Sequence, residues 1–90
     1  MKFEWNKDKA KVNSAKHGVA FAEAKTVFDD PLFVEFYDPD HSDDEERYII
    51  VGQSERGRLL VVSYTDRNQK IRLISAREAT QMEKIAYEEG

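Results

Sequence analysis

The sequence predicts an α+β fold in which helices are packed on one face of an antiparallel sheet. Three runs rich in Ile, Val, Leu and Tyr, at 48–52, 59–65 and 71–76, follow one another with only short polar turns between them. Such runs are typical of the strands of an antiparallel meander. Segments with helical periodicity precede this meander and follow it. Ninety residues without a repeat or a linker indicate one domain, 1–90, with a single modest core.

The first elements are expected to be a strand and a helix. Residues 2–5 alternate polar and apolar side chains, which favours a short strand. Asn6 is a good N-cap for the Lys- and Ala-rich run behind it, so a helix is expected from Lys7 to Lys16 or His17. Gly18 suits the left-handed backbone conformation that ends such a helix.

A second helix is expected from Phe21 to Phe28, because its apolar residues fall on one helical face. Pro31 ends it, and the segment from Leu32 to Tyr37 then alternates like a strand. An acidic loop leads into the three meander strands. A closing helix is expected from Glu78 to Glu88. The element order is therefore β-α-α-β-β-β-β-α.

Charge is segregated along the chain. The net charge of −4 argues against a general nucleic-acid binder. Residues 31–46 hold seven acids and no base, whereas residues 47–77 hold seven bases and two acids. A surface divided in this way suits an anionic partner on one face and a different partner elsewhere.

Composition excludes several functional classes. The absence of cysteine excludes disulfides and thiolate metal sites. There is no Ser-His-Asp, P-loop, zinc or dinucleotide-binding pattern, so neither a metal nor a cofactor is expected. No apolar run reaches the roughly 20 residues of a membrane span, and the first residues lack a signal-peptide pattern. A cytoplasmic protein without membrane contact is therefore expected.

The two histidines are candidates for proton transfer. His17 ends the first predicted helix beside Lys16, and it could act as a general acid or base or contact a phosphate. The helix dipole alone also favours a histidine at a helix C-terminus, and the residues by themselves favour this simpler interpretation. His41 lies among loop carboxylates without a regular ligand spacing, which indicates a solvated turn rather than a metal site.

The arginines of the meander are a stronger signal. Guanidinium groups present a fork of donors that matches phosphate, so arginines clustered on rigid strands suit phosphodiester binding. Alternation along one strand puts Arg58 on the same face as Tyr64. It likewise puts Lys70 with Arg72 on the last strand. The alternative is that these arginines pair with nearby acids, as surface charges commonly do, and both interpretations stay open.

Such residues make a metal-independent acid–base cleavage of RNA chemically possible. The reaction needs cations for the negative charge that develops on the phosphate, and one or two groups that transfer protons. His17, Tyr64, Tyr87 and the glutamates are candidates for proton transfer. Composition and spacing predict no more than this.

Motifs along nearly the whole chain resemble those of BrnT-type toxins. In the first half they are Phe3-Glu4-Trp5, Asn13-x-x-Lys16-His17-Gly18-Val19 and Phe28-x-Asp30-Pro31. In the second half they are His41-Ser42-x-x-Glu45-Glu46-Arg47, Gly52-x-Ser54-x-x-Gly57-Arg58-x-Leu60, Tyr64-Thr65-x-Arg67, Ile71-Arg72-x-Ile74-Ser75-Ala76-Arg77 and Glu83-x-x-x-Tyr87-Glu88. Each fragment alone is a weak signal, but their shared order is specific.

The resemblance implies a ribonuclease toxin of a type II toxin–antitoxin pair with a RelE-like fold. Such toxins inhibit translation by cleaving RNA, and a cognate antitoxin holds them inactive. The implied partner is a BrnA-like antitoxin, which carries a ribbon-helix-helix DNA-binding part. Operator DNA would then be bound only through the toxin–antitoxin complex.

The resemblance also guides the choice of site residues, because RelE-like toxins carry their active site on basic residues of the sheet and of the last strand-to-helix junction. The expected catalytic residues are Arg77, His17, Arg58 and Glu83. The expected substrate-binding residues are Lys16, Arg47, Arg72, Tyr64 and Arg67. No metal ligand is expected.

A function of another class is the alternative, namely a non-catalytic protein-interaction module that binds a ribbon-helix-helix partner. This alternative is supported because the potential catalytic side chains form no distinctive motif. The acidic segment 31–46 supports it too, because it could bind a basic partner. A stand-alone nucleic-acid binder is less favoured, because the chain is acidic and lacks exposed aromatic residues arranged for stacking.

Overall fold

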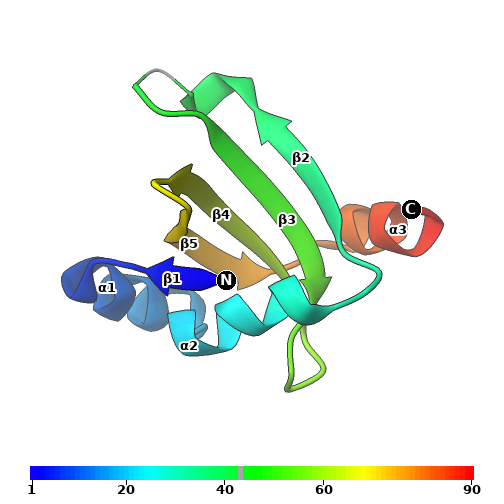
Figure 1. Cartoon of the computed structure of the whole chain (residues 1–90). Helices are drawn as coiled ribbons and strands as arrows, with labels where there is room; N and C mark the ends of the chain where they lie inside the picture. The colour runs from blue at the N-terminus through cyan, green and yellow to red at the C-terminus, as the bar shows by residue number, and fades with distance from the viewer. Residues whose placement is uncertain (43) are drawn as a thin grey trace.

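The computed structural model describes residues 1–42 and 44–90, and it has the expected α+β class and element order. Five strands form one sheet in the order β1-β5-β4-β3-β2 (Figure 1). The strands are β1 (Lys2–Glu4), β2 (Val34–Asp38), β3 (Arg47–Gln53), β4 (Leu59–Arg67) and β5 (Lys70–Glu78). The helices are α1 (Lys7–His17), α2 (Phe21–Ala24) and α3 (Gln81–Glu89), and the 3₁₀ segments are η1 (Lys25–Asp29) and η2 (Pro39–His41).

The sheet is mixed rather than wholly antiparallel, which corrects the sequence-based prediction. The four strands from β2 to β5 pair antiparallel, but β1 runs parallel to β5. A parallel pair needs a long crossover between its strands. Here everything from α1 to β4 lies between β1 and β5 in the chain, so the N-terminus can reach the far edge of the sheet.

Two helices also differ from the prediction. The second helix keeps α geometry only over α2 and continues as η1 to Asp29, and Ala20 gives it no side-chain cap. The closing helix begins at Gln81 rather than at Glu78, because β5 continues through Glu78. Thr80 and Glu83 then form a reciprocal capping box that fixes the start of α3.

The hydrophobic core lies between the sheet and the segment from Val19 to η1. On the helical side, Val19, Phe21, Ala24 and Val27 are buried. They meet one face of the sheet, here called the inner face, which is formed chiefly by Ile50, Leu60, Val62, Leu73 and Ala76. Burial of these apolar side chains is the main favourable term in folding.

Gly52 allows η1 to approach the sheet closely. A Cβ atom at this position would lie 2.8 Å from Cγ1 of Val27, closer than two carbon atoms can pack. A side chain on Gly52 would therefore push η1 away from β3.

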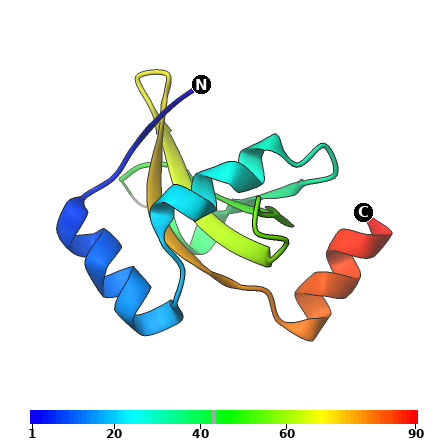
Figure 2. The same ribbon diagram turned by 90° about the horizontal axis from the view of Figure 1, so that it is seen from below.

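Among the described residues, α3 covers one end of the opposite face of the sheet, here called the outer face. Met82 and Ala86 of α3 line a groove of about 240 Å³ with Ile49 and Val51. These two β3 side chains alternate with inward-pointing Ile50, so they point to the outer face. Helices therefore contact both faces of the sheet, not one as predicted. In Figure 2, α1 and α3 lie at opposite ends of the molecule.

Candidate nucleic-acid interface

Strand β5 carries four polar or charged side chains on the outer face, namely Lys70, Arg72, Ser75 and Arg77. The register pairs Arg72 with Thr65, Ser75 with Ser63 and Arg77 with Val61 of β4. A register shift at Ser63/Tyr64 keeps Ser75 and Arg77 on the same face as Arg72. The outer face of β5 therefore presents a line of phosphate-compatible donors.

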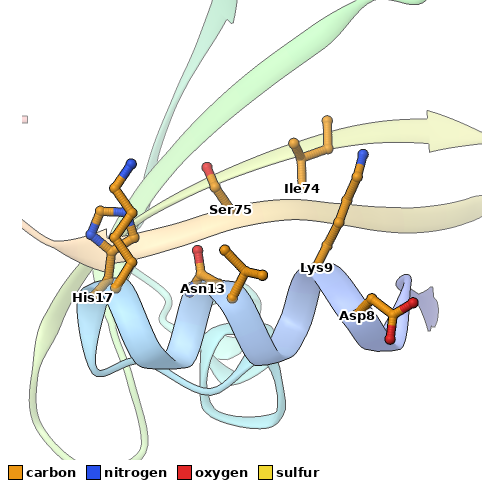
Figure 3. A pocket seen from close by; sticks show the side chains of 8 residues that line it. Asp8, Lys9, Asn13, His17, Ile74 and Ser75 are labelled. Atoms are coloured by element: carbon orange, nitrogen blue, oxygen red, sulfur yellow. The ribbon is translucent and has the colours of Figure 1, made fainter.

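A groove of about 340 Å³ separates α1 from the exposed edge of β5 (Figure 3). Lys16 and His17 line it from α1, and Ser75 lines it from β5. His17 and Lys9 lie towards opposite ends of the groove, with Ser75 between them. We call this the α1–β5 groove. It places an imidazole, an ammonium group and a hydroxyl close to the outer face.

Asn13 fixes the position of α1 against β5. Its amide nitrogen Nδ2 donates to the carbonyl oxygens of Val19 and Ala76, each at 2.9 Å, and its Oδ1 accepts from the Ala76 N–H at 3.0 Å. The side chain thus continues the sheet hydrogen bonds beyond the short β1 strand. His17 follows one helical turn later and lies beside β5 for this reason.

Arg77 is held by Glu83 at the junction between β5 and α3. Its Nη1 and Nη2 atoms each donate to a Glu83 carboxylate oxygen at 2.8 Å. The Arg77 side chain is nevertheless 41% exposed. Its guanidinium is therefore oriented and still accessible from solvent.

Glu83 is fixed as a carboxylate. The hydrogen bonds from Arg77 lower its pKa to about 2, and the Thr80 backbone N–H at 2.8 Å adds to this effect. At neutral pH the group has no proton to donate and is a weak base. The geometry suits an orienting role for Glu83, and proton transfer by Glu83 stays a prediction that this geometry does not favour.

Arg58 lies on the inner side, where it forms an ion pair with buried Glu23. Its Nε donates to Glu23 Oε2 at 3.0 Å, and the Ser54 hydroxyl donates to the same oxygen at 2.7 Å. Its Nη2 also donates to the carbonyl of Gly18 at 3.1 Å. Arg58 thus anchors the end of α1 beside His17, but it does not face the outer surface. A direct catalytic role for Arg58 stays a prediction.

Tyr64 also belongs to the inner face. Its ring stacks on Tyr48 with ring centroids 5.6 Å apart, and its hydroxyl donates to Glu35. Burial and the nearby Glu35 carboxylate raise the pKa of Tyr64 above its usual value. The side chain is therefore separated from the outer-face arginines by the sheet itself. Its predicted contact with substrate stays untested.

The remaining predicted arginines gather on the outer face near the β4–β5 hairpin. Arg47 and Arg72 lie on either side of Thr65 in the sheet register. Arg72 Nη1 donates to Glu4 Oε2 at 2.9 Å, and Arg67 Nε donates to Glu45 Oε2 at 2.8 Å. The structure thus divides the predicted site residues. Arg77, His17 and Lys16 lie at one end of β5, Arg47, Arg67 and Arg72 lie at the other, and Arg58 and Tyr64 lie on the inner face.

Four further residues of this region occur in the family-like motifs but were assigned no role from the sequence: Asn13, Glu45, Thr65 and Ser75. Strand alternation could have placed Thr65 on the face opposite to Tyr64. It could not have placed Ser75 on the face of Arg72, because that placement depends on the register shift at Ser63/Tyr64. The contact partners of Asn13 and Glu45 depend on long-range pairing, which no local pattern indicates.

Two general findings apply to residues 1–42 and 44–90. Within these ranges no group of three or more His, Cys, Asp or Glu side chains is arranged to hold a metal ion. None of the helices described has the length and apolar character needed to cross a bilayer.

The Glu23–Arg58 pair predicts a loss of stability in acid. Hydrogen bonding from Arg58 lowers the pKa of Glu23 from 4.5 to about 2. The contribution to stability is complete above the unfolded-state pKa and is lost as the pH falls from about 4.5 towards 2. The Glu23→Gln variant is expected to be less stable by on the order of 2 kcal/mol at neutral pH. Its stability should also depend less on pH in the acidic range.

Urea unfolding between neutral and acidic pH measures both effects. Glu55→Gln changes an exposed glutamate in the neighbouring turn and serves as the matched control. If the wild type and Glu23→Gln lose stability equally as the pH falls, the pair does not contribute as expected.

Comparison with known proteins identifies the family. The 1.1 Å crystal structure of the Brucella abortus ribonuclease toxin BrnT matches this fold with a TM-score of 0.66, covering 90% of this chain and 99% of that chain at 24% sequence identity. No curated protein gives a significant match. The family model for the ribonuclease toxin BrnT of type II toxin–antitoxin systems matches residues 5–83. The chain therefore belongs to the BrnT family of ribonuclease toxins.

Proposed function

We propose that this chain is a metal-independent endoribonuclease that cleaves RNA on its outer face, at the α3 end of β5. The observation that carries the proposal is the position of Arg77, whose oriented guanidinium lies two residues beyond Ser75 of the α1–β5 groove. Residues i and i+2 of a strand share a face and lie about 6.6 Å apart. Cations and a histidine that can transfer protons are thus available around one phosphate.

These side chains fit the cleavage of a phosphodiester by its own 2′-hydroxyl. The 2′-oxygen forms a bond to phosphorus while the bond from phosphorus to the 5′-oxygen breaks. One proton leaves the 2′-hydroxyl and one is delivered to the leaving 5′-oxygen. We assign proton transfer to His17, and stabilisation of the phosphorane charge to Arg77 and Lys16. The products are a 2′,3′-cyclic phosphate and a 5′-hydroxyl.

The proposal is tested by incubating the purified chain, free of antitoxin, with labelled single-stranded RNA in the presence and absence of EDTA. Cleavage is expected in both, because the required positive charge comes from side chains. The His17→Ala variant is expected to cleave at least about 100-fold more slowly, as is typical for the loss of a general acid or base. Lys25→Ala, at an exposed residue of η1 on the inner side of the sheet, is the control and is expected to retain wild-type activity.

Three outcomes would contradict parts of this proposal. Loss of cleavage with EDTA would show a metal-dependent reaction. Equal rates for His17→Ala and the wild type would remove His17 from the mechanism. A folded wild-type chain that leaves RNA intact would favour the non-catalytic interaction module.

An antitoxin is the expected partner of a toxin of this type, and we propose a BrnA-like ribbon-helix-helix protein. The β2 edge of the sheet exposes Phe33, Phe36 and Tyr37 within the acidic segment 31–46. Exposed apolar side chains framed by acids suit a basic, partly apolar segment of a protein partner. In the same assay, an equimolar amount of this antitoxin should abolish cleavage. Operator DNA would be bound only by the complex, and the RNA substrate would place the toxin in the cytoplasm.

A further inference from the structure

A row of side chains in register crosses the outer face at the end away from α3. The sheet pairing aligns one residue of each strand, in the order Asp38, Arg47, Thr65, Arg72 and Glu4. Neighbouring strands lie about 4.8 Å apart, so the two arginines flank Thr65 at close range. We call Arg47, Thr65 and Arg72 the arginine row.

The hydroxyl of Thr65, at the centre of this row, is buried without a hydrogen-bond partner among the described residues. The residue is only 2% exposed. A buried hydroxyl without a partner is unfavourable, and such groups are rare in native proteins. Its neighbours in the row, Arg47 and Arg72, are half-buried. Their long flexible side chains can cover the Thr65 hydroxyl or move aside and expose it. A donor between two guanidinium groups is suited to an anion.

Glu45 shows that several cations converge beside the row. Its carboxylate pairs with Arg67, and it lines a cavity of about 250 Å³ together with Arg47. The hydrogen bonds from Arg67 lower the pKa of Glu45, and the charges of Arg72 and Arg47 act in the same direction. One carboxylate is therefore within the electrostatic reach of three guanidinium groups. Arginines arranged in this way can bind phosphate oxygens as well as they bind carboxylate oxygens.

We propose that Arg67 and the arginine row form a second phosphate-binding subsite. This subsite binds a backbone phosphate of single-stranded RNA away from the scissile bond. When RNA is absent, the Glu45 carboxylate occupies it. This inference rests on the proposed ribonuclease function. Both partners of the Arg67–Glu45 pair are about two-fifths exposed, at 45% and 40%. Exposed pairs are weak, so a phosphate can displace the carboxylate at little cost.

The position of the subsite specifies the class of substrate. Arg72 and Arg77 are five residues apart on β5, which corresponds to about 16 Å along the strand. A single phosphate cannot contact both ends of this line, whereas an RNA segment with several linked phosphates can. The subsite therefore favours an RNA with several linked phosphates over a mononucleotide.

Binding of a 2′-O-methyl RNA oligonucleotide, which lacks the attacking hydroxyl, tests the subsite independently of cleavage. Glu45→Gln is expected to bind it several-fold more tightly than the wild type, because the competing carboxylate is gone. Glu46→Gln makes the same change at the next residue, whose carboxylate accepts from Tyr48 instead, and should bind like the wild type. If both variants gain affinity equally, the change in net charge alone explains the tighter binding, and the proposal is overturned.

Thr65→Val removes the hydroxyl while nearly preserving the shape of the side chain. The variant is expected to bind the oligonucleotide about fivefold more weakly, yet to melt at the same temperature as the wild type or higher, because a buried unpaired hydroxyl is lost. A purely structural threonine would instead lower the melting temperature and leave affinity unchanged. That result would overturn the assignment.

A competition experiment shows whether the subsite binds the phosphate of RNA or a free phosphate ion. Inorganic phosphate, at the same concentration of phosphate groups, is expected to compete poorly with the oligonucleotide. Equal competition would identify a site for free anions rather than for RNA. If the wild type cleaves RNA but the Glu45 and Thr65 variants bind as the wild type does, the subsite fails and the ribonuclease stands. If the expected binding shifts occur without any cleavage of RNA, the ribonuclease fails and the subsite stands.

Discussion

The Arg77→Ala variant is expected to keep its fold and to lose RNA cleavage by about 100-fold or more, the effect typical of removing one donor from a developing oxyanion. Arg77 combines two properties that such a donor needs. Two hydrogen bonds to Glu83 orient its guanidinium, and the side chain remains open to solvent on the outer face. A half-exposed ion pair contributes about 1 kcal/mol or less to stability. Initial cleavage rates and thermal melting of the same preparations separate the two effects.

Two further variants control for charge and geometry. Arg77→Lys keeps the positive charge but cannot make a bidentate contact, so an intermediate rate is expected. Arg56→Ala removes one positive charge from the exposed β3–β4 turn and should cleave like the wild type. If folded Arg77→Ala also cleaves like the wild type, the active site lies elsewhere.

Glu83→Gln decides between the two roles considered for Glu83. A general acid or base replaced by glutamine would lose nearly all activity. A residue that only orients Arg77 would lose little, because the glutamine oxygen still accepts a hydrogen bond. The second result is expected, since a pKa of about 2 leaves Glu83 without a proton at neutral pH. A large loss with Arg77 still in place would restore the catalytic role predicted for Glu83 from the sequence.

The elements with clear local signals were predicted well. Helix α1 begins after Asn6, whose side chain accepts from the Lys9 N–H, and it ends at Gly18 with φ of 69°. The start of α3 also had a local signal, since Thr80-x-x-Glu83 is a capping-box pattern. The predicted helix started at Glu78, two residues before the Thr80 cap, so this signal was not used. The parallel pairing of β1 could not be predicted, because three residues of alternating pattern do not say which edge of the sheet they join.

The candidate site was predictable only within single strands. Alternation correctly grouped Lys70 with Arg72, because side-chain direction repeats every second residue. It could not show that Arg47 and Arg72 flank Thr65, since this depends on the register of three strands and on the shift at Ser63/Tyr64. Nor could it show which arginines are paired. Glu23 lies 35 residues from Arg58 in the chain, yet its carboxylate accounts for the position of that arginine.

The Asn13→Ala variant is expected to lose about 3 kcal/mol of folding free energy, the largest stability effect predicted for this chain. Asn13 is 6% exposed, and its three hydrogen bonds satisfy the backbone of Val19 and Ala76. Alanine leaves these buried groups without partners, at about 1–3 kcal/mol for each unsatisfied group. The expected fall in melting temperature is on the order of 15 °C for a domain of this size.

The same variant tests whether α1 positions His17 for catalysis. Ser14→Ala alters the next, exposed residue of α1 and is the matched control, with little change expected in stability or rate. Below its melting temperature, folded Asn13→Ala should still cleave RNA more slowly than the wild type, because α1 is no longer registered against β5. If it melts early but cleaves normally while folded, Asn13 stabilises the fold without setting the geometry of the site. If it melts like the wild type, the packing of Trp5 and Ala10 against the core suffices to hold α1 in place.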